Sequence, residues 1–161
     1  MLTNQYTELN YTIYNDESEL DEEDLKLIES ARKACETSYS PYSGFQVGAA
    51  LLLENNEVIS GSNQENSSYP AGLCAERVAL FQAGAGHSQH KIRKIAVTAK
   101  KAANEKYIPV TPCGSCRQVM LEYEVKQSSA IEVIMQIADN KWVKTFSTEV
   151  LLPFCFNKNA L

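Results

Sequence analysis

Two short cysteine motifs in different parts of the chain constrain the fold more than any other feature. They read Cys74-Ala75-Glu76 and Pro112-Cys113-Gly114-Ser115-Cys116. Cys113 and Cys116 are spaced i, i+3, so the start of one helix presents both sulfurs on the same side. Because residues i and i+2 do not share a face of a regular helix, Cys74 and Glu76 reach one point only if Cys74 lies at a helix cap or in the first turn. The sequence therefore predicts two helices whose N-termini meet.

Three thiols gathered in this way are typical ligands for zinc. Zinc usually takes four ligands, so three protein sulfurs leave one position for water, as in a catalytic site rather than a structural one. Glu76, two residues from a ligand, is then the natural acid and base for that water. Two alternatives stay open for the pair Cys113 and Cys116. It could be a redox pair, or it could belong to a structural zinc site whose fourth ligand is one of the two histidines of the chain, His87 or His90.

Arg77 follows Glu76 directly and is a candidate for tuning such a site. Three thiolates leave a zinc cluster with net negative charge, which weakens the ion as a Lewis acid. Two helix N-termini, and hydrogen bonds donated by Arg77 to a thiolate, would offset that charge. The plainer interpretation is a surface arginine paired with an acid.

Composition narrows the class of protein. The chain has five cysteines, an odd number, and its N-terminus is polar and acidic, without the pattern of a secretory signal. We therefore expect free thiols and a cytoplasmic protein. No apolar run is long enough to span a membrane. With a net charge of −5 and basic residues grouped only within 91–101, which we interpret as the solvated edge of a strand, no nucleic-acid partner is expected and a small substrate fits better.

Periodicity predicts an α/β protein. Residues 1–20 are polar and are predicted to be an extension without fixed structure, whereas residues 21–161 are predicted to form a single domain. Within it, helices and strands alternate in the order α-β-β-α-β-α-β-β-α, which implies a sheet covered by helices on both faces. The expected strands are 45–53, 58–61, 92–99, 131–137 and 142–146. The expected helices begin at Asp21, Cys74, Cys113 and Ser147.

Several further stretches, in order along the chain, give these motifs a context. They are Pro41-Tyr42-Ser43-Gly44-Phe45-Gln46-Val47-Gly48-Ala49-Ala50, Gly61-Ser62-Asn63-Gln64-Glu65-Asn66, Tyr69-Pro70, Arg117-Gln118-Val119 directly after Cys116, and Leu151-Leu152-Pro153 followed by Phe156. With the cysteine motifs they resemble the small, homotetrameric, zinc-dependent cytidine deaminases from about Asp24 to Phe156. The resemblance implies a three-layer α/β/α sandwich around a five-stranded mixed sheet, and a single zinc-dependent deaminase domain over residues 21–161.

The resemblance also implies roles for particular residues. Cys74, Cys113 and Cys116 would hold one Zn²⁺ per subunit, and Glu76 would be the proton shuttle. Other positions would contact a nucleoside, some of them across a subunit interface. They are Asn63 and Glu65 at the ribose 3′-hydroxyl, Phe45 against the pyrimidine, the Ala75 backbone amide at the 2-oxo group, Phe156 from a neighbouring subunit, and Tyr69, also across an interface.

The implied activity is hydrolytic deamination of cytidine and 2′-deoxycytidine to uridine and 2′-deoxyuridine, with release of ammonia. Zinc-bound hydroxide would attack C4 while Glu76 moves the protons, in a step of pyrimidine salvage. A deaminase of a cytosine-nucleoside antibiotic of the blasticidin type shares the metal motifs, but Phe45 and the Asn-x-Glu-Asn stretch favour the nucleoside. Acidic charge speaks against an enzyme that edits polynucleotides, and an intact Glu76 speaks against an inactive binding protein.

Overall fold

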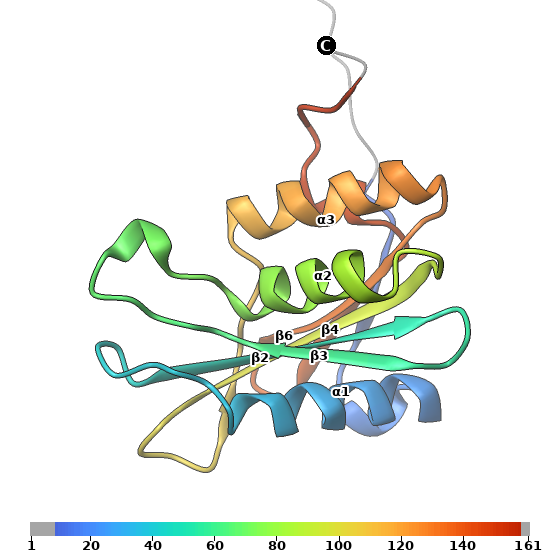
Figure 1. Ribbon diagram of the computed structural model, residues 1–161. Coiled ribbons are helices and arrows are strands. Elements are labelled where there is room, and N and C mark those ends of the chain that lie inside the picture. Colours follow the sequence, from blue (N-terminus) through green and yellow to red (C-terminus); the bar gives the residue numbers. More distant parts are fainter. Residues whose placement is uncertain (1–8, 159–161) are drawn as a thin grey trace, which may run out of the picture.

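The computed structural model describes residues 9–158. Within that range the strands form one sheet with the order β1-β7-β6-β4-β2-β3, and β5 adds to β4. Helix α1 covers one face, and α2 and α3 cover the other (Figure 1). In chain order the main elements are β1 (Tyr11–Tyr14), α1 (Glu22–Cys35), β2 (Phe45–Leu53), β3 (Val58–Ser62), α2 (Ala75–Gly86), β4 (Ile92–Lys101), β5 (Tyr107–Ile108), α3 (Gly114–Gln127), β6 (Glu132–Ala138) and β7 (Lys141–Thr145). Short 3₁₀ helices span Glu17–Glu19 (η1), Tyr69–Ala71 (η2) and Thr148–Leu151 (η3).

The three-layer α/β/α sandwich is confirmed, and the sheet is mixed. Strands β4 and β6 run parallel, whereas β2–β3, β2–β4 and β6–β7 are antiparallel. The described residues contribute seven strands rather than the five expected. The two additional ones are β1, from the N-terminal extension, and the two-residue β5. Both are too short to carry a periodic pattern of their own.

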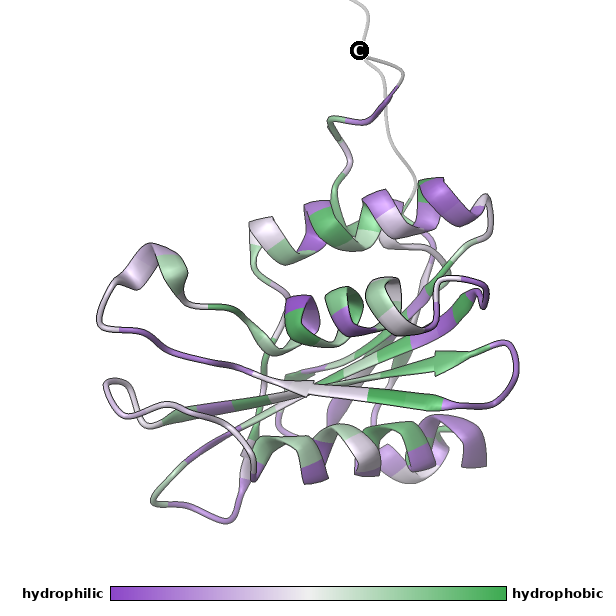
Figure 2. Cartoon of the chain, in the orientation of Figure 1, coloured by the Kyte–Doolittle hydropathy of each residue, from purple (hydrophilic) through white to green (hydrophobic). Residues whose placement is uncertain are grey.

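Each face of the sheet has its own hydrophobic core. Leu51 and Leu53 of β2 pack with α2 and α3, whereas Ala50 and Leu52 pack with α1. Successive side chains of a strand point to opposite faces, so a strand buried on both sides is apolar throughout. Figure 2 shows this, with hydrophobic residues concentrated in the central strands and hydrophilic ones on the outward side of α1. Within residues 9–158, no helix combines the length and apolar character needed to cross a bilayer.

The extension predicted over residues 1–20 contributes to the sheet. Residues 1–8 lie outside the described range, but β1 pairs antiparallel with β7, from Tyr11 opposite Thr145 to Tyr14 opposite Trp142. Glu17 then forms a bidentate contact with Arg32 of α1, with distances of 2.8 and 2.6 Å. This differs from the disorder expected for residues 11–20. The strand obtains its hydrogen bonds from β7, so few apolar residues of its own suffice.

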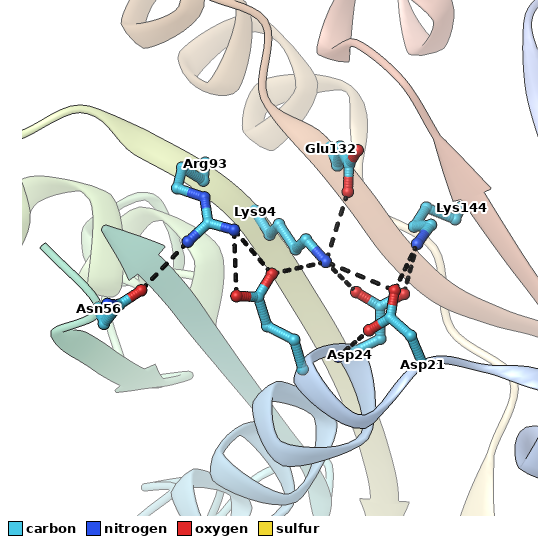
Figure 3. Close-up of polar contacts among 8 residues, drawn as sticks. Asp21, Asp24, Asn56, Arg93, Lys94, Glu132 and Lys144 are labelled. Carbon is cyan, nitrogen blue, oxygen red and sulfur yellow. Dashed lines mark hydrogen bonds and ion pairs between the residues drawn. The ribbon is translucent and has the colours of Figure 1, made fainter. Parts of the chain in front are cut away.

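A buried ionic cluster joins α1 to the sheet, and it corrects in part the interpretation of residues 91–101 as a solvated edge (Figure 3). Asp24 is fully buried, and its two carboxylate oxygens accept hydrogen bonds from Lys94 of β4 and Lys144 of β7, each at 2.5 Å. Lys100 is also buried and pairs with Glu36 at 2.5 Å. Burial alone would lower the pKa of Lys144, but Asp24 raises it above the usual range. Lys94 and Lys100 of β4 therefore turn inward toward acidic residues of α1 and the residue that follows it, whereas Lys91 and Lys101 are exposed.

Gly48 marks a close contact between α1 and the sheet. A Cβ at this position would lie 1.9 Å from the carbonyl oxygen of Ala31 and 2.7 Å from the backbone nitrogen of Cys35. We expect Gly48→Ala to lower the free energy of unfolding by about 3 kcal/mol or more, because backbone atoms of α1 must move to admit the methyl group. Urea denaturation measures this change. Gly86→Ala is the control, since a Cβ there meets nothing within 4 Å. Equal effects at both positions would show that α1 shifts freely.

Candidate active site and metal centre

The two cysteine motifs meet on the face of the sheet that α2 and α3 cover. Cys74 is the N-cap of α2, Cys113 is the N-cap of α3, and Cys116 lies in the first turn of α3. The three sulfurs are within 4.8 Å of one another, with 3.9 Å between Cys74 and Cys113 and 3.5 Å between Cys113 and Cys116. The cap position of Cys74 agrees with the geometric prediction from its spacing to Glu76. Two helix N-termini thus point at one group of sulfurs, and their dipoles favour thiolates there.

The charges around the sulfurs suit a metal. The pKa of the Cys74 thiol is lowered to about 5, because its sulfur accepts hydrogen bonds from the Cys116 thiol and from the Arg77 guanidinium. The same sulfur–sulfur hydrogen bond, with burial, raises the pKa of Cys116. Arg77 Nη2 lies 3.8 Å from Cys74 Sγ. Arg77 therefore contacts the sulfur cluster, as expected for a residue that tunes the site. It forms no pair with an acidic side chain within the described residues.

No fourth protein ligand joins the three cysteines within residues 9–158. His87 and His90 lie in the loop between α2 and β4, where they face Glu57 at 3.1 Å and Glu54 at 3.9 Å. This arrangement excludes the structural zinc site in which a histidine completes the set. Three thiols, one of them with a lowered pKa, suit Zn²⁺, and a four-coordinate ion held by them would keep one position for a small molecule.

Glu76 places a carboxyl group beside the sulfurs. One oxygen of this carboxyl, Oε2, is buried and has no hydrogen-bond partner among the described residues, and the side chain is 3% exposed. Burial raises the pKa of this carboxyl, and the nearby Cys74 raises it further. A buried polar atom without a partner is costly and is uncommon unless a ligand or water completes it. Glu76 is therefore placed to exchange protons with a molecule bound next to the sulfurs.

A pocket of about 650 Å³ opens at this point. That volume lies in the usual range for small-molecule sites. Residues from four regions line it: the loop before β2 with the start of that strand, the segment after β3, and the starts of α2 and of α3. Among them are Phe45, Asn63, Glu65, Tyr69, Glu76 and Cys113. The pocket thus contains most of the residues singled out from the sequence.

Comparison with known proteins identifies the family. The profile of the cytidine and deoxycytidylate deaminase zinc-binding region matches residues 21–132. The chain belongs to this family. A cytidine deaminase of Halalkalibacterium halodurans is 50% identical over 96 residues, which are 60% of this chain and 68% of that protein. The crystal structure of cytidine deaminase from Burkholderia pseudomallei superposes with a TM-score of 0.68 at 39% identity, covering 82% of this chain and 98% of that one. Blasticidin-S deaminase of Bacillus cereus is more distant, at 27% identity over 143 residues.

In this deaminase, Asn63 and Glu65 make structural hydrogen bonds as well as lining the pocket. The Asn63 amide accepts from Ser38 Oγ and the Val47 N–H and donates to the Phe45 carbonyl, at 2.6 to 2.9 Å. Glu65 accepts from the Ser43 hydroxyl and from the N–H groups of Tyr42 and Ser43. The Ser43 hydroxyl and the Tyr42 N–H lower the pKa of Glu65, which keeps it ionised. The ring of Phe45 and the loop 40–44 are thereby held at the pocket wall.

Three other predicted residues of this deaminase, Ala75, Tyr69 and Phe156, differ in how they relate to the pocket. Ala75 is buried as the first residue of α2, where a backbone N–H has no helical acceptor. Tyr69 is 79% exposed at the rim and makes an edge-on ring contact with Tyr42, with centroids 6.3 Å apart. Phe156 does not line the pocket of its own chain. It lies on the C-terminal segment, 59% exposed.

Three contacts at this end of the molecule escaped sequence reasoning. Arg117 donates to the carbonyls of Pro112 and Leu151, at 2.8 and 3.1 Å. Gln118 Nε2 donates to the Phe156 carbonyl at 2.8 Å. Arg117 and Gln118 belong to the Arg117-Gln118-Val119 stretch noted in the sequence, which marked them as candidates. No sequence pattern indicates which carbonyl groups their side chains bind.

Proposed function

We propose that this deaminase converts cytidine and 2′-deoxycytidine into uridine and 2′-deoxyuridine with release of ammonia. The observation that carries the proposal is the buried carboxyl of Glu76, with one oxygen unpartnered, beside three sulfurs at the end of an open pocket. Zinc held by Cys74, Cys113 and Cys116 would supply Lewis acidity at that point. The family and the geometry support the same reaction.

Glu76 moves the protons in this proposal. It takes one from the water that adds to C4 of the pyrimidine, delivers it to the ring nitrogen, and then assists the departing ammonia. A carboxyl that is not a metal ligand is free to do both, and its raised pKa brings it closer to neutral pH, where such transfers are efficient. Water and cytidine then balance against uridine and ammonia without a further reactant.

The other pocket residues would orient the nucleoside. Glu65, ionised and held by Ser43, would accept strongly from the ribose 3′-hydroxyl beside Asn63. Phe45 would pack on the pyrimidine, and the N–H of Ala75, at the first position of α2, would hold its 2-oxo group. Tyr69 and Phe156 would act across an interface in a homotetramer with shared sites. Large exposed aromatic rings at both positions favour such contacts. We assign the enzyme to cytoplasmic pyrimidine salvage and infer no nucleic-acid or membrane partner.

The test follows the loss of ultraviolet absorbance when cytidine is added to the purified protein. We expect deamination of both nucleosides, about one zinc per chain by metal analysis, and loss of activity after chelation. Blasticidin S and single-stranded DNA or RNA, tested in parallel, should react far more slowly. A faster reaction with the antibiotic would move the assignment to that substrate, and an absence of activity on every nucleoside would reject the proposal.

Arg77→Ala should lower turnover about tenfold and leave most of the zinc in place. The reason is that Arg77 contacts Cys74 from outside the sulfur cluster and withdraws charge from the thiolate. Arg77→Lys should be intermediate, since it keeps the charge but loses the planar donor group. Turnover and zinc per chain are measured for each variant. Complete loss of metal in Arg77→Ala would instead show that this residue is needed to build the site.

A further inference from the structure

The C-terminal segment, residues 152–158, leaves the body of the protein beyond η3 and passes α3 toward solvent (Figure 1). It carries Phe154, which is 98% exposed, and Phe156, which is 59% exposed. Large rings held out in this way are typical of a contact surface. Because the proposed function places Phe156 in the site of a second copy, what fixes the path of this segment also affects that neighbouring site.

Two side chains of α3 hold the segment, one just before its start and one near its end. Arg117 binds the carbonyl of Leu151, the last residue of η3, and Gln118 binds the carbonyl of Phe156 itself. Arg117 also binds the carbonyl of Pro112, the residue before Cys113. Arg117 and Gln118, which hold the C-terminal segment, thus directly follow Cys116 at the start of α3.

We propose that Arg117 and Gln118 are positioning residues that set the path of residues 152–158 and so present Phe156 to the active site of a second copy of this chain. The inference rests on the proposed function and adds to it a physical link. One helical turn of each copy positions sulfurs for its own site and an aromatic ring for its neighbour's site. Gln118 is the sharper probe, because Arg117 also contacts the loop that carries Cys113.

Gln118→Ala should raise KM for cytidine about threefold to tenfold, the factor expected for one ordinary hydrogen bond, with kcat within about twofold of wild type. Zinc content and thermal unfolding should not change. Glu122→Ala, an exposed residue farther along α3, is the matched control and should leave KM unchanged. An unchanged KM in Gln118→Ala overturns the proposal. So does a parallel loss of zinc and stability, which would mean a purely structural role.

Mixed assemblies test whether the effect crosses between copies. One copy carries Phe156→Ala and keeps its Glu76, and the other carries Glu76→Gln and keeps its Phe156. Co-expression should restore activity that neither has alone. Adding Gln118→Ala to the copy with Glu76→Gln should reduce this restored activity, whereas adding it to the copy with Phe156→Ala should not. Equal effects in both placements, or full activity of Phe156→Ala alone, would contradict the proposal.

A readout independent of catalysis separates this inference from the proposed function. Chymotrypsin cleaves after exposed aromatic residues, and Phe154 and Phe156 lie on the held segment. Gln118→Ala should be trimmed there faster than wild type and Glu122→Ala. If no nucleoside is deaminated but the protease difference appears, the proposed function fails while the anchoring stands. Equal trimming of all three proteins overturns the anchoring.

Discussion

Glu76→Gln is expected to lower the turnover of cytidine by at least a factor of about 100, the lower range of what a positioned acid and base contributes. Glutamine keeps the shape and burial of the side chain but cannot take up and release a proton. Because the three sulfurs meet without Glu76, the variant should bind zinc as wild type does. Initial rates and zinc per chain, measured on the same preparation, give both quantities.

Glu122→Gln is the control for this experiment, since that carboxylate lies exposed on α3. It should retain full activity. Near-normal turnover in Glu76→Gln would remove the proton-shuttle role. Loss of zinc in that variant would instead mean that the carboxyl belongs to the coordination set, and the open position inferred for water would no longer exist.

Asp24→Asn is expected to lower the free energy of unfolding by about 3–5 kcal/mol, the usual effect of removing one partner from a buried ion pair. Asp24 satisfies Lys94 and Lys144 together, one with each carboxylate oxygen. The amide cannot accept from both, so two buried lysines, each 8% exposed, would lose their shared counter-charge. Chemical denaturation monitored by circular dichroism measures the change.

Glu22→Gln offers a matched control two residues away on the same helix. Its pair with Lys26 is solvent-exposed, with side chains 83% and 73% accessible, and such surface pairs contribute little. A change below about 1 kcal/mol is expected there. If Asp24→Asn proves as mild as the control, Asp21, Glu23 and Glu132 must compensate for the loss, since each of these carboxylates also lies within 4 Å of Lys94.

The cysteine site could be predicted because its constraints are local. The spacing to Glu76 predicted Cys74 at a helix cap or in the first turn, and apolar patterns bounded by turn residues predicted β2, β3, β4, β6 and β7. The inward turn of Lys94 and Lys144 could not be predicted, because their partner Asp24 is 70 and 120 residues away along the chain. Asp24 itself looked like an ordinary acidic residue in the first turn of a helix, where the dipole favours it in any surroundings.

Strand β1 escaped prediction for a different reason. Four residues between polar neighbours carry little signal, and their stability comes from an edge that β7 offers. The contacts of Gln118 and Arg117 depend on where a chain terminus runs, which a residue pattern does not contain. In each of these cases the missing information is a long-range partner rather than a local preference.

Cys74 and Cys113 are 39 positions apart in sequence but adjacent in space, and α2, β4 and β5 lie between them. An ion that joins them closes this stretch into a ring, and ring closure removes conformations from the unfolded chain much as a covalent cross-link does. Zinc bound by these cysteines would thus stabilise the folded state of this deaminase as well as take part in its chemistry. Depletion of zinc would then shorten the lifetime of the folded enzyme as well as abolish its activity.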